Sequence, residues 1–162
     1  MPLRARTAAI LLAAAWSGSG IMTTAQAAAG CTAASSAAAF NLYNPLSAAA
    51  TTTTASITIT CQAAIQLLVS YNIALSAGAS GAVAARTMLN GAVPMSYQLY
   101  IDPVYSIPWG DGTGGSQTVT DGYLLAVLTP VIRTYTAYGR IPPLQNLTPG
   151  SYLDTITVLV TY

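Results

Sequence analysis

Apolar and polar residues alternate along several short stretches of this chain, as in strands with one face turned inward. In SITITC, Ile57, Ile59 and Cys61 share one face, and threonines occupy the other. Similar stretches are LLVSYNIAL at 67–75, MSYQLYI at 95–101, QTVT at 117–120, YLLAVL at 123–128 and VIRTYTAY at 131–138. Short strands at this spacing, with turn residues between them, predict an all-β fold, an antiparallel sandwich or barrel.

The last stretch, SYLDTITVLVTY, alternates up to the final residue. Its apolar positions are Ile156, Val158, Val160 and Tyr162, with threonines between them. Soluble domains usually avoid a long, exposed, apolar edge strand, because such a strand invites pairing with another chain. We expect a strand over residues 152–162, and its apolar face has to be accounted for.

Glycine, proline and aspartate mark the connections between these strands. We expect hairpin turns at Asp111-Gly112 and Asp121-Gly122, because Asp and Gly both tolerate positive φ. A Pro/Gly-bounded loop, GRIPPLQNLTPG, precedes the last strand. The Ala-rich segment AAAGCTAASSAAAF is compatible with a helix by propensity alone. Its glycine, its Ser/Thr content and its cysteine favour a first strand or an extended arm.

Residues 1–27 show the three regions of a secretory signal peptide. Two arginines precede an apolar run from Ala8 to Trp16, and the small-residue pattern Ala25-Gln26-Ala27 follows. The run is too short to span a bilayer. We expect cleavage after Ala27, with an uncleaved anchor as the alternative. The exported protein, residues 28–162, is then one domain that does not span a membrane, without internal repeats.

Charged residues are scarce in residues 28–162. Three arginines and four aspartates give a net charge of −1, and lysine, glutamate and histidine do not occur. A nucleic-acid binder needs a basic patch to neutralise phosphates, and this chain has none. Hydrophobic residues make up 53% of the sequence, which argues against a disordered chain. A sparsely charged surface suits packing against other protein, although an ordinary secreted β-protein has a similar composition.

The residue inventory argues against an enzyme. Without histidine, a Ser-His-Asp or Cys-His arrangement cannot form. Without lysine and glutamate, most acid–base and Schiff-base schemes are also excluded. Asp102 and Asp111 flank PVYSIPWG as a conceivable carboxylate pair. DGTGG resembles a calcium loop that lacks the other carboxylates. We expect no catalytic residue, no metal site and no cofactor.

Cys31 and Cys61 are the two cysteines, and in an exported chain such a pair predicts one disulfide. Closing a loop of about 30 residues would stabilise the fold by about 3–4 kcal/mol. The two are not in a CxxC arrangement, and no histidine is available to complete a metal site. A redox or metal role is therefore not expected.

Aromatic side chains are the remaining candidates for ligand binding. Trp109 and Tyr105, with Tyr100 and Tyr123, would form a sugar-binding surface. Packing on strand faces and in turns is the simpler explanation of the same residues.

Several motifs occur in a fixed order along residues 28–162. They are FNLYNP after the first cysteine, ITITC at the second, RTM at 86–88, YQLYID, WGDGT, YGRIPPLQ and the terminal GSYLDTITVLVTY. This set resembles the spore coat protein U domain family, the secreted pilins of the archaic, Csu-type chaperone–usher pathway. WGDGT, YGRIP and a terminal GSYxDT strand are specific in combination.

The resemblance implies an immunoglobulin-like antiparallel sandwich that lacks its final strand. A periplasmic chaperone would supply a strand during export to an outer-membrane usher, and the amino-terminal arm of a neighbouring pilin subunit would replace it in the fibre. Residues 152–162 would then border an open groove, with Ile156, Val158, Val160 and Tyr162 as contacts. The alternative is that these four face an intact core. The implied function is a structural subunit of a surface pilus, or fimbria, in adhesion and biofilm formation.

Position by position, the resemblance implies a disulfide between Cys31 and Cys61. It also implies a turn at Gly110, Asp111 and Gly112, and a loop before the final strand at Tyr138, Gly139 and Arg140.

The amino-terminal arm departs from the family pattern. Cleavage after Ala27 leaves only Ala28, Ala29 and Gly30 before the first cysteine, too few to donate a strand. Cleavage near Gly18 or Gly20 would retain IMTTAQAAAG as an arm. The short form instead fits a lectin-like adhesin at the pilus tip, or a stand-alone spore-coat or surface protein.

Overall fold

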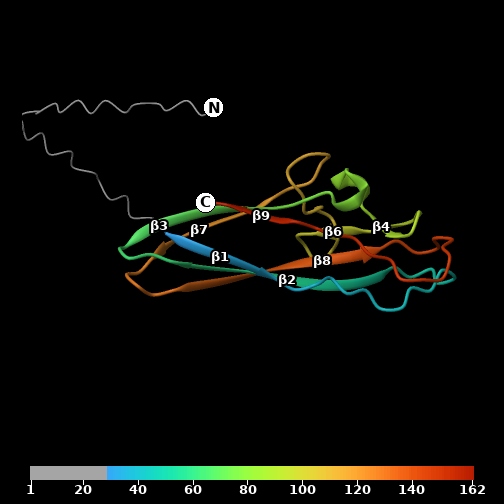
Figure 1. Ribbon diagram of the computed structural model, residues 1–162, viewed down its shortest axis with the longest axis horizontal. Helices are drawn as coiled ribbons and strands as arrows, with labels where there is room; N and C mark the ends of the chain where they lie inside the picture. The colour runs from blue at the N-terminus through green and yellow to red at the C-terminus, as the bar shows by residue number, and fades with distance from the viewer. Residues whose placement is uncertain (1–28) are drawn as a thin grey trace, which may run out of the picture.

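The computed structural model describes residues 29–162, which form two packed antiparallel sheets with a small hairpin beside them (Figure 1). The first sheet has the strand order β1 (Gly30–Ser35), β2 (Thr51–Gln62), β8 (Val131–Ile141) and β6 (Gln98–Tyr100). The second has the order β7 (Val119–Leu125), β3 (Leu67–Leu75) and β9 (Val158–Thr161). The hairpin pairs β4 (Thr87–Asn90) with β5 (Val93–Ser96).

Two single-turn 3₁₀ helices, η1 (Gly78–Ser80) and η2 (Val83–Ala85), connect β3 to the hairpin. No helix within residues 29–162 is long and apolar enough to cross a membrane. The expected all-β, immunoglobulin-like sandwich is confirmed. The predicted signal peptide and its cleavage site lie outside the described residues.

The alternation of apolar positions determines which side chains enter the core. Ile57, Ile59 and Cys61 of β2 are at most 3% exposed, and β3 covers the stretch LLVSYNIAL from end to end. The part Gly30–Ser35 of the Ala-rich segment forms β1 rather than a helix, because each of its residues pairs with β2. Cys31 lies opposite Cys61 in this pairing, and the two form the expected disulfide.

The structure corrects the expected hairpin turn at Asp121-Gly122, since both residues lie inside β7 and pair with β3. A Cβ on Gly122 would lie 3.1 Å from the carbonyl oxygen of Val69, so glycine here permits a close backbone approach. At Asp111-Gly112 the chain does turn, with Gly112 at φ 88°. An Asp-Gly pair in a sequence shows only that a turn is tolerated there. Pairing with a neighbouring strand decides whether the turn forms.

Three other segment boundaries also differ from expectation. Tyr138, Gly139 and Arg140 belong to β8, and the loop begins after Ile141. The stretch MSYQLYI is divided at Tyr97, where the chain leaves the hairpin and joins β8. Only Val158–Thr161 of the expected last strand is regularly paired, with β3. These boundaries depend on partner strands distant in sequence.

Candidate functional site: an open groove between β1 and β9

A groove of about 810 Å³ opens on the side of the sandwich where β1 and β9 are the outer strands. Residues 35–43, from the end of β1 onwards, form one wall, and residues 150–156 with Val158, the first residue of β9, contribute the other. Core side chains from both sheets and from the hairpin line it, namely Ile57, Leu75, Met88, Met95, Tyr97, Leu99, Ala137 and Ile141. The hydrophobic core therefore reaches the surface along this side.

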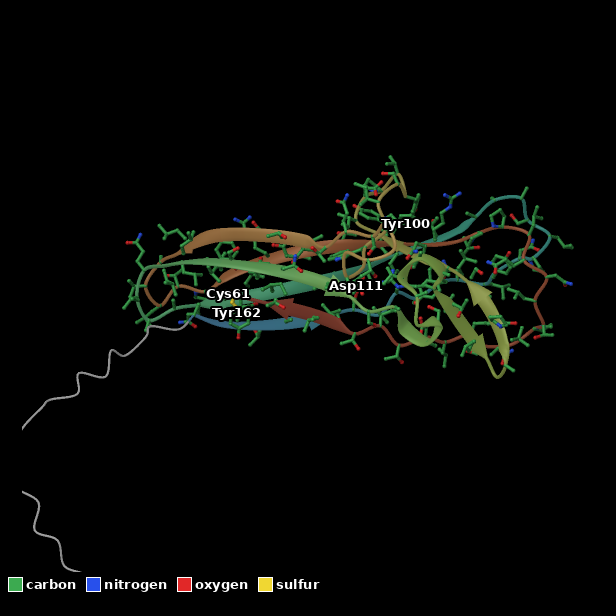
Figure 2. The ribbon with its side chains drawn as sticks, turned by 90° about the horizontal axis from the view of Figure 1, so that it is seen from above. Cys61, Tyr100, Asp111 and Tyr162 are labelled. Carbon is green, nitrogen blue, oxygen red and sulfur yellow. A yellow bond between two sulfur atoms is a disulfide. The ribbon has the colours of Figure 1, made fainter. Side chains whose placement is uncertain are left out.

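A smaller hollow of about 300 Å³ continues the opening between Cys31–Ala33 and Val158–Tyr162. Figure 2 shows Tyr162 and Cys61, the disulfide partner of Cys31, towards the same end of the sandwich, away from Tyr100 and Asp111. Within the described residues β1 pairs only with β2, and β9 only with β3. Each strand therefore keeps one edge without a ladder partner on the side of the opening.

The four residues predicted to contact a partner all line this opening. Ile156 lines the large groove, Val158 lines both hollows, and Val160 and Tyr162 line the smaller one. The first three are half-buried and pack against the core, whereas Tyr162 is 64% exposed at the rim. Leu159 also borders the smaller hollow, but it is 60% exposed and does not belong to the core cluster, in keeping with the predicted alternation. Contact with a partner stays a prediction.

Asp154 and Thr157 fix the wall formed by residues 150–158. The Asp154 carboxylate accepts hydrogen bonds from the backbone N–H of Ala79 at 2.8 Å and from the Tyr97 hydroxyl at 2.6 Å. Thr157 exchanges hydrogen bonds with Ser76, since its N–H donates to Ser76 Oγ and its carbonyl accepts from Ser76 N–H. Burial and the bond to Asp154 raise the pKa of Tyr97, so this hydroxyl keeps its proton.

Phe40 fixes the opposite wall. Its ring packs edge-to-face on Tyr97, with centroids 6.2 Å apart, and lies over Gly139 of β8. A Cβ at Gly139 would lie 2.8 Å from the ring and 2.9 Å from Thr53, so only glycine leaves room for Phe40. Nearby, the Tyr43 hydroxyl donates to the carbonyl oxygen of Pro142 at 3.1 Å. The FNLY motif therefore packs on the YGR motif, through Phe40 and Gly139.

Arg86 is fully buried, a position that the sequence analysis did not assign. Its guanidinium donates to the carbonyl oxygens of Leu75, Ser76 and Trp109 and to the side-chain oxygen of Gln98, at 2.6–3.3 Å. Burial lowers the pKa of Arg86, yet an arginine stays charged in proteins. No carboxylate pairs with it among the described residues. The sequence feature that could have pointed to this buried position is the arginine of the RTM motif, in a chain that has no lysine.

The structure corrects the expectation that Trp109 offers a ligand surface. Its side chain is 0% exposed, and its indole N–H donates to the Ile73 carbonyl oxygen at 3.0 Å. Tyr105 does lie at the surface, edge-to-face with Tyr100, and the Arg140 guanidinium lies 5.5 Å from its ring centroid. Of the four aromatic residues predicted to form a ligand surface, Trp109 is buried, whereas Tyr100, Tyr105 and Tyr123 are partly exposed.

Asp102 and Asp111, the conceivable carboxylate pair, each accept hydrogen bonds from residues of their own turn. Desolvation raises the pKa of Asp102, but the hydrogen bonds that it accepts from Ser106 and Ile107 outweigh this and hold the pKa below its usual value. The side-chain and backbone bonds from Thr113 likewise lower the pKa of Asp111. A general acid needs a raised pKa, so these shifts have the opposite sign.

The side of the sandwich opposite the groove is closed by polar aromatic contacts. The Tyr135 hydroxyl donates to Asp121 at 2.5 Å, and the Tyr71 and Tyr135 hydroxyl oxygens are also 2.5 Å apart. The Arg133 guanidinium lies 5.2 Å from the ring centroid of Tyr123. These contacts join β8 to β3 and β7, whereas the outer strands on the groove side have no such link.

The fold and the open side define an immunoglobulin-like β-sandwich with a core uncovered between two strand edges. The sequence profile of the Spore Coat Protein U domain matches residues 19–159, so the chain belongs to this family. This match confirms the resemblance seen in the motifs.

Two individual proteins are also similar. Protein U of Myxococcus xanthus is 36% identical over 89 residues, which are 54% of this chain and 46% of that protein. The chain thus spans less than half of this relative. A chain in the crystal structure of the CsuC–CsuE chaperone–tip adhesion subunit pre-assembly complex, from the archaic chaperone–usher Csu pili of Acinetobacter baumannii, matches with a TM-score of 0.56. It shares 19% identity over 83% of this chain and 40% of its own length, a likeness of fold.

Proposed function

We propose that the protein is a structural subunit of a surface fibre that a chaperone–usher pathway assembles by strand complementation. The observation that carries the proposal is the groove between β1 and β9, where core side chains are uncovered beside two free strand edges. An added strand would gain backbone hydrogen bonds from an edge, and its alternate side chains would enter the hollows. Val158 and Val160 would be among its contacts.

The partners in this proposal are a periplasmic chaperone, an outer-membrane usher and neighbouring pilin subunits. The family membership and the fold shared with a chain of a chaperone–tip adhesion subunit complex support it. The protein would then be exported through the periplasm to a pilus on the cell surface, in adhesion and biofilm formation. Its role is structural, and no enzymatic step is involved.

In the same proposal, the donor arm is the stretch IMTTAQAAAG at residues 21–30. The family match begins at residue 19 and so includes this stretch. Signal cleavage would then fall near Gly18 or Gly20 rather than after Ala27. The mass of the exported protein distinguishes the two cleavage sites.

The test is electrophoresis of the exported protein in SDS, with and without boiling, after production together with the matching chaperone and usher. Strand-complemented fibres dissociate slowly, because all residues of an inserted strand must leave together. We expect a ladder of oligomers that collapses to monomer on boiling. A monomer held only in a chaperone complex would indicate a tip adhesin. A monomer without any complex, as for a stand-alone spore-coat protein, would contradict the proposal.

A further inference from the structure

The two ends of the sandwich both expose aliphatic side chains. We define the disulfide end as the connections at 63–66 and 126–130 with the strand residues next to them, and the loop end as the segments at 36–50 and 142–150 (Figure 1). The disulfide end exposes Ile65, Leu68, Leu124, Val127, Leu128 and Ile132, each between 51% and 71%. The loop end exposes Leu42, Leu46 and Leu144, at 96%, 88% and 63%.

Hydrogen bonds hold the segments of each end together. At the disulfide end, Leu128 N–H donates to the Ala63 carbonyl oxygen at 2.9 Å. At the loop end, the Tyr43 hydroxyl accepts from Gln145 N–H at 2.7 Å. None of the connecting segments that define the two ends contains a charged residue. Each end is therefore a built, uncharged surface rather than a loose loop.

Leu128 and Leu144 hold a backbone conformation that leucine normally avoids. Their φ angles are 55° and 59°, in the left-handed region where glycine or asparagine is usual. Both side chains are also nearly two-thirds exposed. A glycine at either position would remove the backbone strain and the exposed apolar surface together. Two unfavourable features at the same residue, once at each end, indicate that these side chains act in a contact outside the isolated domain.

The direction of the strands determines which ends would meet, if the proposed strand complementation holds. Every strand ladder in the described part of the chain is antiparallel. A donor strand antiparallel to β9 runs towards the loop end of the acceptor, because β9 runs from Leu75 towards Asn72 of β3. The donor's own β1 then begins at Gly30, at its disulfide end. The disulfide end of the donor therefore arrives at the loop end of the acceptor.

We propose that the disulfide end of one copy packs against the loop end of the next copy, with Leu128 and Leu144 in the contact. This inference rests on the proposed function, since strand donation brings the two ends together. The contact joins different surfaces of identical subunits, so it can repeat from copy to copy along a fibre. No charge is buried when it forms, because neither set of end segments carries one.

A cysteine cross-link tests the contact in assembled fibres. Leu128→Cys and Leu144→Cys are introduced into one chain, and the fibres are oxidised, boiled in SDS and separated without reductant. We expect a covalent ladder that survives boiling and collapses to monomer when reductant is added. One control carries Leu128→Cys alone. The other combines it with Val104→Cys, which is 76% exposed in the connection after β6.

The outcomes separate this contact from the proposed function. A ladder that disappears on boiling in every variant, including the cysteine pair, would leave strand complementation intact and overturn the contact. Covalent dimers from Leu128→Cys alone would overturn it too, because two disulfide ends would then meet. The absence of any ladder, boiled or not, from the unmodified chain would remove the proposed function and the contact with it. The double variant Leu128→Asn/Leu144→Asn is expected to keep the fold, because asparagine tolerates the left-handed region, and its unboiled ladder is expected to dissociate faster on warming.

Discussion

Tyr135 of β8 donates a hydrogen bond to the carboxylate of Asp121 on β7 over 2.5 Å, and this bond joins the two sheets opposite the groove. Tyr71 of β3 packs edge-to-face on Tyr135 and adds a second hydroxyl to the contact. Within residues 29–162, no ladder joins β1 to β9 on the other side. The sandwich is thus fastened along one side and open along the other.

Replacing Tyr135 with phenylalanine should lower the free energy of unfolding by about 1–2 kcal/mol, because the partly buried carboxylate of Asp121 loses its donor. Urea unfolding of the purified subunit measures the change. Tyr138→Phe is the matched control on the same strand, since the Tyr138 hydroxyl has no side-chain hydrogen bond in the described residues. Equal losses in the two variants would contradict a role for the inter-sheet bond.

Below neutral pH, stability should fall only in acid. The hydrogen bond from Tyr135 holds the pKa of Asp121 below its usual value of about 3.9, and the bonds from Thr113 do the same for Asp111. A carboxyl with a lowered folded-state pKa stabilises the fold above its unfolded pKa and loses this contribution as pH falls through the folded value.

We therefore expect a melting temperature that is nearly constant between about pH 5 and 8, since no histidine titrates there, and that falls below about pH 4. Thermal unfolding followed by circular dichroism across this range gives the profile. Tyr135→Phe should reduce the fall. A decline that begins near pH 6 would show that another group controls the acid response.

Arg86→Lys should lower the free energy of unfolding by at least about 3 kcal/mol, although it keeps the positive charge. A lysine has three donors on one nitrogen and cannot reach all the acceptors that the guanidinium serves, so buried carbonyl oxygens lose their partners. Urea unfolding again supplies the measurement. The control is Arg140→Lys at the surface, for which a loss under about 1 kcal/mol is expected. A near-neutral Arg86→Lys would show that the network tolerates missing bonds.

Val158→Asp should strongly reduce the amount of subunit recovered in complex with its chaperone, because an unpaired carboxylate would face the apolar hollow where the added strand belongs. Thr161→Asp is the matched control on the same strand, because Thr161 is exposed and lines neither hollow. Purification of the complex from the periplasm provides the readout. The same recovery for both variants would argue that the groove is not the binding site.

Opening the disulfide should destabilise the fold by about 3–4 kcal/mol, from the 30-residue separation of its cysteines. The double variant Cys31→Ser/Cys61→Ser and chemical reduction should give similar urea midpoints. If β1 stays paired with β2 and only the unfolded chain gains freedom, hydrogen exchange in β1 will remain slow. Rapid exchange confined to β1 would show that the disulfide holds the strand itself in place.

The sequence by itself determined the features that depend on neighbouring residues. Period-2 alternation located β3 and the inward positions of β2, because a strand turns successive side chains to opposite faces. It also identified Ile156, Val158 and Val160 as one face, and the ordered motifs led to the family.

Tertiary structure decided the features that depend on which distant segments meet. Asp121-Gly122 became part of a strand because β3 pairs with it, and Gly139 is required because Phe40 packs over it. The burial of Trp109 and Arg86 follows from carbonyl oxygens that converge from segments far apart in the chain. The pattern of neighbouring residues does not predict such long-range contacts, because these hydrogen bonds and close contacts form only after the sheets have come together. The open groove belongs to the same class, since it exists only where two strand edges of different sheets face one another.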